Sequence, residues 1–142
     1  MTYRIQRVDG RDEEHQATLH WLDKTTFGIT APPIEPEFGC WWLVHHAGEP
    51  VGYAGLKWSH TEVDGIYLCR SGVLEEHRGH GLQVRLLRAR ETWARRTLAT
   101  VMVTDTTDNY ASANSLIKAG YRLYKPDEPW AFPNSLYWRK KL

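Results

Sequence analysis

The sequence predicts a mixed α/β (α+β) fold, in which a central twisted and mostly antiparallel sheet carries helices on both faces. Strand-like segments alternate along the chain with amphipathic, helix-like segments. Three β-rich segments follow one another with no helix between them, which is typical of an antiparallel meander. The 142 residues contain no repeat, low-complexity tract or long linker, so residues 1–142 are expected to form a single domain.

The first half of the chain is expected to form one helix and four strands. Tyr3 to Val8 alternates weakly, like a first strand, and Arg11 to Lys24 places apolar residues at helical spacing. After a proline-rich loop, the meander comprises Cys40 to His45, Pro50 to Trp58 and Gly65 to Val73.

The second half of the chain is expected to place two helices among three strands. Gly81 to Thr97 has one apolar stripe and is the clearest helix of the sequence. Leu98 to Asp105 is typical of a buried strand, and Ala111 to Ala119 of a short helix that ends at a glycine. The last two expected strands are Tyr121 to Tyr124 and Leu136 to Arg139.

The charge balance disfavours partners that are recognised through a strong overall field. Eighteen Lys and Arg face 17 Asp and Glu, for a net charge of +1, so neither a nucleic acid nor a membrane partner is expected. No segment approaches the roughly 18 to 20 apolar residues of a spanning helix, and the N-terminus does not resemble a signal peptide. A cytoplasmic location is therefore expected. One basic helix keeps a nucleic-acid alternative open; its arginines are Arg85, Arg88, Arg90, Arg95 and Arg96.

The cysteines and histidines do not indicate a metal site or a disulfide framework. Cys40 and Cys69 both lie in apolar, strand-like segments, which favours core or pocket positions. His77 and His80 flank Arg78 but have no nearby third ligand, so no metal is expected.

The segment that carries chemistry is a strand followed by a glycine-rich turn and an amphipathic helix. Within it, Arg78-Gly79-His80-Gly81-Leu82-Gln83 precedes the helix directly. Glycines let a backbone approach phosphate groups closely, and the first N–H groups of a helix are unpaired and lie at its positive end. The pattern predicts a site for a diphosphate. It lacks the Gly-Lys-Ser/Thr and Gly-x-Gly-x-x-Gly spacings of other nucleotide loops.

Two motifs resemble those of the GCN5-related N-acetyltransferase (GNAT) family. Arg78 and Gly81 match the Arg and central Gly of the pattern Q/R-x-x-G-x-G/A, although Gln83 replaces its last residue. The segment from Asn109 to Tyr121 is similar to a later N-x-x-S/A helix that ends in K-x-G-F/Y. The resemblance covers roughly Tyr3 to Leu142, and the aromatic C-terminal segment resembles a small bacterial or bacteriophage type.

The resemblance implies that acetyl-CoA is the acyl donor. In the family, the strand that corresponds to Gly65 to Val73 splays from the strand that corresponds to Leu98 to Asp105, and the pantetheine arm lies between them. Backbone groups after the splay and the N–H groups of the loop would then hold the cofactor. The implied cofactor-binding residues are Gly72, Val73, Leu74, Arg78, Gly79, His80, Gly81, Leu82, Gln83, Asn109 and Ser112.

The resemblance also implies direct attack by a primary amine on the thioester, with no acyl-enzyme. The acceptor would be a small molecule, a peptide N-terminus or a lysine. The tyrosine that donates a proton to the thiolate in many family members would fall near Leu116, so the acid is left open. The candidate catalytic residues are Ser115, Tyr121 and Tyr67. The base is left open among Glu62, Asp64, a backbone carbonyl and a water, and none of these stands out.

Two further alternatives stay open at this level. The missing tyrosine favours a non-catalytic acyl-CoA-binding regulatory module as an alternative to an enzyme. An exposed last hairpin would allow two copies of the chain to pair as a homodimer. The acceptor pocket is expected opposite the cofactor, with Trp21 and Trp130 as candidate lining residues because both adjoin loops.

Overall fold

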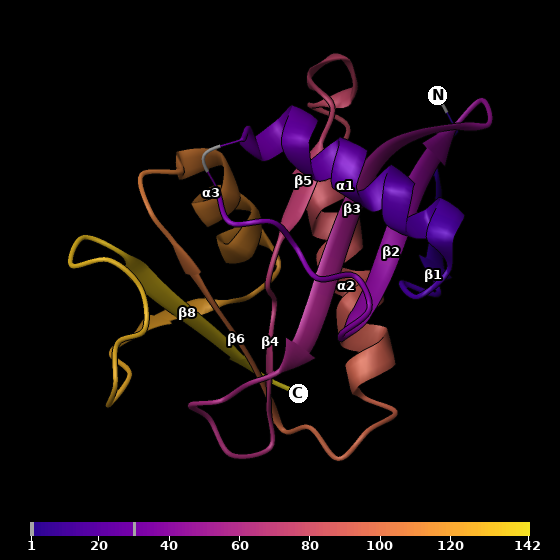
Figure 1. Cartoon of the computed structure of the whole chain (residues 1–142). Helices are drawn as coiled ribbons and strands as arrows, with labels where there is room; N and C mark the ends of the chain where they lie inside the picture. Colours follow the sequence, from indigo (N-terminus) through magenta and orange to yellow (C-terminus); the bar gives the residue numbers. More distant parts are fainter. Residues whose placement is uncertain (1, 30) are drawn as a thin grey trace.

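One sheet and three helices make up the part of the chain that the computed structural model describes, residues 2–29 and 31–142 (Figure 1). The strands are β1 (Arg4–Val8), β2 (Cys40–His46), β3 (Glu49–Trp58), β4 (Gly65–Tyr67), β5 (Ser71–Val73), β6 (Val101–Thr106), β7 (Arg122–Tyr124) and β8 (Leu136–Lys141). The helices are α1 (Glu13–Phe27), α2 (Leu82–Ala94) and α3 (Tyr110–Lys118), with a short 3-10 helix η1 (Glu75–His77) before α2.

The sheet is mostly antiparallel, as predicted. Its strand order is β1-β2-β3-β4-β6-β8-β7, and β5 also pairs with β3. Only the β4–β6 pair is parallel among the described strands, and the chain between these two strands includes α2, which provides the crossover that parallel neighbours require. The mixed fold expected from the sequence is confirmed.

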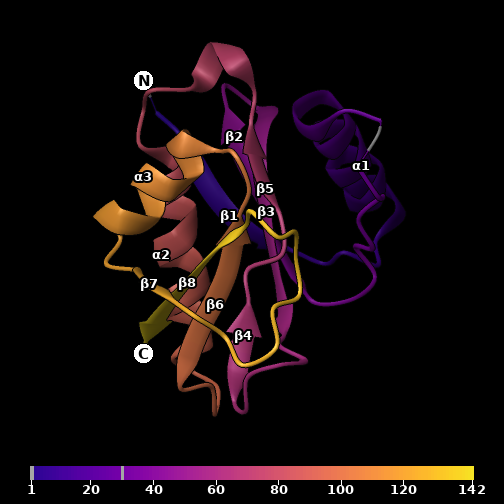
Figure 2. The same cartoon turned by 90° about the vertical axis from the view of Figure 1, so that its left-hand side faces the viewer.

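Helices cover both faces of the sheet. In Figure 2, where the sheet is seen nearly edge-on, α1 lies on one side and α2 and α3 lie on the other. The core on the α1 side contains Leu19, Leu22 and Tyr53, and the core on the α2–α3 side contains Leu86 and Leu116. Each helix therefore buries its apolar stripe against the sheet.

The structure corrects one expected element, the continuous strand from Gly65 to Val73. Residues 68–70 interrupt it, so that β4 and β5 are separate strands. On β3, three steps lead from Lys57 to Ala54, whereas their partners Tyr67 and Ser71 are four steps apart, which is the extra residue of a β-bulge. The bulge redirects the chain so that β5 leaves the neighbourhood of β6.

The gap between β5 and β6 is the feature that positions the site. β4 pairs with β6 over three residues, from Gly65 opposite Val101 to Tyr67 opposite Val103. Beyond this point β5 pairs with β3, while β6 continues beside β8. The second edge of β5 thus has none of the described strands against it. The predicted splay is present.

Candidate active site

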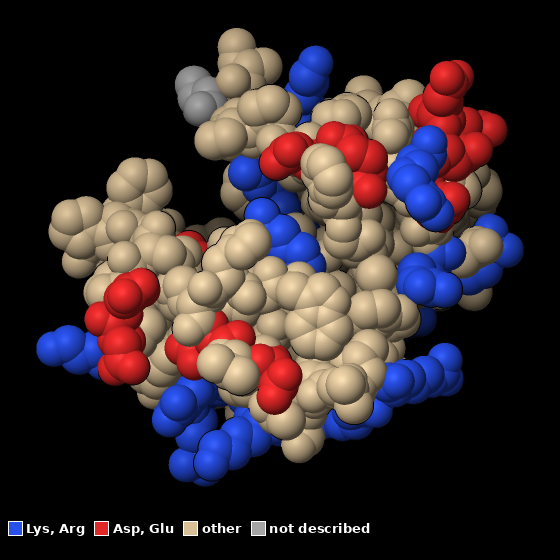
Figure 3. Space-filling view, turned by 60° about the horizontal axis from the view of Figure 1, so that its bottom comes forward, with Lys and Arg blue, Asp and Glu red and all other residues tan. Residues whose placement is uncertain are grey.

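A cavity of about 480 Å³ opens where β5 and β6 separate. Its walls come from the irregular turn between β4 and β5, from the end of β6, and from α2 and α3. Figure 3 shows a hollow on one face of the molecule, with basic side chains beside it. The side chains that line the cavity include Phe27, Tyr67, Cys69, Arg70, Ser71, Gln83, Leu87, Arg90, Thr104, Asp105, Asn109, Ser112, Ser115, Leu116 and Phe132.

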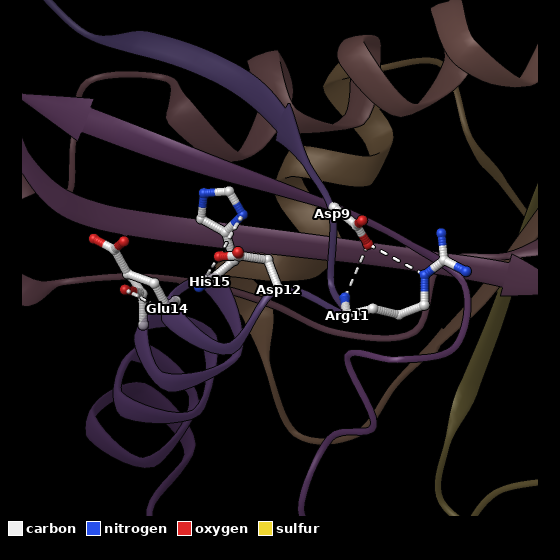
Figure 4. Close-up of polar contacts among 6 residues, drawn as sticks. Asp9, Arg11, Asp12, Glu14 and His15 are labelled. Atoms are coloured by element: carbon white, nitrogen blue, oxygen red, sulfur yellow. Dashed lines mark hydrogen bonds and ion pairs between the residues drawn. The ribbon is translucent and has the colours of Figure 1, made fainter.

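A second hollow, of about 530 Å³, lies beside the turn between β1 and α1. There, Asp12 caps α1 by accepting a hydrogen bond from the His15 N–H at 3.0 Å (Figure 4). Asp9 accepts from the backbone N–H of Arg11 at 2.9 Å, and this bond lowers the pKa of its exposed carboxyl. These contacts shape a turn and a helix end. The first cavity lies at the gap between β5 and β6, where a strand edge is free, and it is therefore the candidate site.

The free edge of β5 presents backbone groups to this cavity. Leu74 donates its N–H to the Val51 carbonyl at 2.8 Å, and the Arg70 carbonyl accepts from Gly55 at 2.8 Å, so residues 70 and 74 turn their backbone groups to β3. Hydrogen bonding alternates along a strand, so Gly72 also faces β3, whereas Ser71 and Val73 face the gap. The predicted backbone contacts here are Gly72, Val73 and Leu74. Of these, Val73 faces the gap, whereas Gly72 and Leu74 face β3. Ser71, which was not predicted, faces the gap as well.

The predicted phosphate loop has the backbone of an anion-binding turn. Gly79 and Gly81 adopt φ values of 84° and 71°, in the left-handed region that favours glycine. Gly81 is the N-cap of α2 and supplies no side-chain cap, so the first N–H groups of the helix, beginning at Leu82, have no partner from a capping side chain. The His80 side chain is exposed beside the ring of Tyr3, at 5.4 Å between centroids.

Arg78 and Gln83 tie this loop to β5. Arg78 donates from Nε to the Val73 carbonyl at 3.1 Å, and the Ser71 hydroxyl donates to Oε1 of Gln83 at 2.9 Å. Gln83 stands where the family pattern has a small residue. Its side chain lines the cavity and anchors the first turn of α2 to the open edge of β5.

The other wall of the cavity is one face of α3. Asn109 caps the helix by accepting a hydrogen bond from the Ser112 N–H at 3.0 Å. Ser112 and Ser115 follow at helical spacing and line the cavity together with Leu116, which is buried. The position where the family resemblance expects a tyrosine is therefore apolar, and Ser115 is the nearest hydroxyl along the chain.

The two predicted catalytic tyrosines lie in different places. Tyr67 lines the cavity and donates its hydroxyl hydrogen to Oδ1 of Asp105 at 2.9 Å. Tyr121 is buried outside the cavity lining, where its hydroxyl donates to Glu91 at 3.0 Å. Burial, and then the neighbouring carboxylate, raises the pKa of both phenols, so both keep their protons at neutral pH.

Sequence reasoning missed two charged residues of the cavity. Arg90 is 2% exposed and donates to the carbonyls of Leu86 and Gly55, both at 3.1 Å. No ion pair joins it to an acid in the described chain, and burial lowers its pKa to about 10, which still leaves it charged at neutral pH. Asp105 is half-buried at the end of β6. A polar residue that ends a buried strand was the available signal for Asp105; nothing local marked Arg90.

Arg70, by contrast, is neutralised by a neighbour. Its Nη1 contacts both carboxylate oxygens of Asp23 at 3.2 Å, and Asp23 also accepts a hydrogen bond of 2.5 Å from the Tyr53 hydroxyl. The guanidinium stacks over the ring of Phe27, with 4.8 Å from Cζ to the ring centroid. This network fixes the wall between α1 and the bulge.

The cavity reaches both faces of the sheet. Thr104 and Asp105 are consecutive on β6 and point to opposite faces. Thr104 pairs with Trp138, which is buried in the core on the α2–α3 side, so Asp105 faces the α1 side. Both line the cavity. The lining therefore reaches Gln83 in the first turn of α2 and the polar face of α3 on one side of the sheet, and Phe27 at the end of α1 on the other.

Two other kinds of site are absent from the part of the chain that is described. No cluster of three or more His, Cys, Asp or Glu side chains within residues 2–29 and 31–142 has the arrangement of a metal site. None of the described helices has the length and apolar character to cross a membrane.

Comparison with known proteins agrees with this geometry. The family profile described as "Acetyltransferase (GNAT) family" matches residues 3–121. The chain belongs to the GNAT family. A comparison with curated proteins gives no match.

Solved GNAT-like structures share the whole fold. The structure of a NatC complex bound to Gag peptide and CoA matches with a TM-score of 0.78 and 18% identity, over 100% of this chain and 99% of that chain. An IAA acetyltransferase from Bacillus cereus matches with a TM-score of 0.74 and 15% identity, over 99% and 100%. A Bacillus subtilis acetyltransferase in complex with CoA matches with a TM-score of 0.71 and 15% identity, over 99% of both chains. These likenesses establish the fold of the GNAT protein.

Proposed function

We propose that this GNAT protein is an N-acetyltransferase that transfers an acetyl group from acetyl-CoA directly to a primary amine. The observation that carries the proposal is the cavity between β5 and β6, which runs from Ser71 on the free edge of β5 to Gln83 in the first turn of α2, next to the uncapped start of that helix. A pantetheine arm needs hydrogen-bonding groups along its length, and a diphosphate needs N–H donors at one end. The chain offers the first along β5 and the second at the adjoining start of α2.

The donor would lie along β5 with its phosphates at the loop. Backbone groups of Ser71 and Val73 would bind the arm, and the N–H groups from Gly79 to Gln83 would bind the phosphates. Asn109 and Ser112 would contact the arm from α3. The solved relatives with CoA named in their descriptions support this placement, since the chain has their fold.

The departing thiolate would be stabilised from the α2–α3 side. Ser115 lines the cavity and would pass a proton to the sulfur, in the place of the missing tyrosine. Arg90 adds a buried positive charge in the same wall, which favours an anion over a neutral thiol. Tyr121 already donates its hydroxyl hydrogen to Glu91, which makes Ser115 the better candidate.

Two measurements test the proposal. Calorimetry with CoA and acetyl-CoA should give saturable binding, and acetyl-CoA should release thiol when primary amines are added. Binding without amine-dependent thiol release, across small amines, peptides and lysine derivatives, would favour a regulatory acyl-CoA-binding module instead. A folded protein that binds neither CoA nor acetyl-CoA would refute the assignment.

A further inference from the structure

Asp105 is a carboxylate with one oxygen held and the other open. Its Oδ1 accepts two hydrogen bonds, from the Tyr67 hydroxyl at 2.9 Å and from Nε1 of Trp130 at 2.8 Å. Its Oδ2 accepts none from any described residue. The two donors come from β4 and from the β7–β8 loop, so the carboxylate is fixed from both sides. Its free oxygen is the part left to meet a ligand in the cavity.

No cation of the described chain neutralises this carboxylate. No described lysine, arginine or histidine forms an ion pair with Asp105. Arg70, a charged residue that lines the same cavity, is already paired with Asp23. A half-buried carboxylate with no cation paired to it is stabilised by an opposite charge, so this part of the cavity favours a cationic ligand.

Aromatic rings lie beside Asp105; Tyr67 lines the cavity, whereas Trp130 and Tyr137 lie outside its lining. The rings of Tyr67 and Trp130 meet edge to face with centroids 6.1 Å apart, and Trp130 meets Tyr137 in the same way at 4.6 Å. At the mouth, Phe27 and Phe132 line the cavity and are largely exposed. Apolar, aromatic walls suit the methylene stem of an alkylammonium ion. Its ammonium group would be attracted both by the faces of the rings and by the carboxylate, which binds it more strongly than either would alone.

We propose that Asp105 binds the acceptor as a primary alkylammonium ion with an apolar stem and serves as its general base. This inference rests on the proposed function. Asp105 takes one proton from the ammonium group, and the amine lone pair then forms the C–N bond at the thioester carbonyl. The C–S bond breaks and its electron pair leaves with the sulfur. The second proton of the attacking nitrogen goes to the thiolate through Ser115 or water, and Asp105 releases its proton to solvent. Tyr67 and Trp130 are positioning residues for the carboxylate.

The test compares Asp105→Asn with the unmodified protein. The asparagine oxygen can keep both hydrogen bonds at Oδ1, so the fold is retained, but an N–H₂ group replaces the open oxygen and repels an ammonium ion. Thiol release from acetyl-CoA is measured with n-butylamine and Nα-acetyl-lysine methylamide, which are cationic, and with methoxyamine, which is uncharged at neutral pH. We expect kcat/KM for the two cationic amines to fall by about 10² to 10⁴-fold, and for methoxyamine to change far less.

Two controls separate the possible failures. Asp108→Asn replaces an exposed carboxylate of the same loop region that pairs with Asn134 outside the cavity lining, and it should leave all three rates unchanged. CoA affinity, measured by calorimetry, should be the same in Asp105→Asn as in the unmodified protein. An equal loss for charged and uncharged amines, or no loss at all, would overturn the role of Asp105 while acetylation itself stands. If the unmodified protein binds no CoA or acetylates none of the amines, the proposed function itself is refuted.

Discussion

The left-handed backbone at Gly81 offers the sharpest test of the phosphate loop. Gly81 has φ = 71° and a Cβ added there would meet open space, so Gly81→Ala introduces backbone strain and no clash. An L-residue in this region costs roughly 1–2 kcal/mol. The loop can relieve that strain by leaving its present conformation, which would turn the N–H groups away from the phosphates.

The matched control is Gly48→Ala in the turn between β2 and β3. Gly48 has φ = 80°, and a Cβ added there would also meet open space, but it lies in the β2–β3 hairpin turn and not in the loop before α2. Both variants should lose a similar free energy of unfolding, about 1 kcal/mol once the stiffer unfolded chain is counted. Only Gly81→Ala should bind CoA more weakly, by a factor of about 5–30 for 1–2 kcal/mol.

Urea unfolding gives the free energy of unfolding of each variant, and calorimetry gives its affinity for CoA. Pantetheine, which lacks the diphosphate, should bind the two variants alike. The reasoning is refuted if Gly81→Ala loses stability but keeps full CoA affinity. It is equally refuted if Gly48→Ala weakens CoA binding to the same extent.

Three other predictions concern packing, ionisation and covalent chemistry. Gly72→Ala should lower the free energy of unfolding by about 1–3 kcal/mol in urea titrations, because its Cβ would lie 2.8 Å from Thr26 Cβ and from Tyr53 Cε1. Burial and Asp23 raise the pKa of Tyr53 above its ordinary value of 10.0. The contribution of Tyr53 to the free energy of unfolding should therefore be fully present below pH 10 and be lost as the pH rises above it. Tyr53→Phe should reduce that slope by about 1.4 kcal/mol per pH unit, and an unchanged slope would contradict the assignment. Cys69→Ser should retain amine-dependent thiol release, because burial raises the pKa of the Cys69 thiol and the transfer is direct; a loss of all activity would indicate an acyl-enzyme.

The predicted elements matched the structure where the conformation of a short segment is specified by its own residues. The glycine turn at 79 and 81, the helix that follows it and the short helix after Asn109 depend on residues close together along the chain; Asn109 caps that short helix, a role that the sequence prediction did not assign to it. Local backbone preference and a side chain that reaches its own helix end are sufficient to specify them. The strand from Gly65 to Val73 was wrong as one element, because its bulge exists only against the register of β3.

The residues of the candidate site likewise fall into those that local patterns predict and those that depend on distant parts of the chain. The loop and the polar face of α3 could be found from the sequence, because both belong to recognisable local patterns. Asp105 could not be singled out from the sequence, since its role depends on Tyr67, which is 38 residues away, and on Trp130, which is 25 residues away. Arg90 looked like one more arginine of a basic helix until burial distinguished it.

By itself, the order of apolar and glycine residues determined most of the elements, the mixed fold and the glycine turn for which we propose a diphosphate ligand. Only the folded chain decided which edge of β5 is free, which arginine of the described chain is buried without a counter-ion and which carboxylate keeps an open oxygen. The physical reason is that helix starts and tight turns are governed by neighbours along the chain. Burial and ion pairing are instead governed by groups that meet only after distant strands have paired.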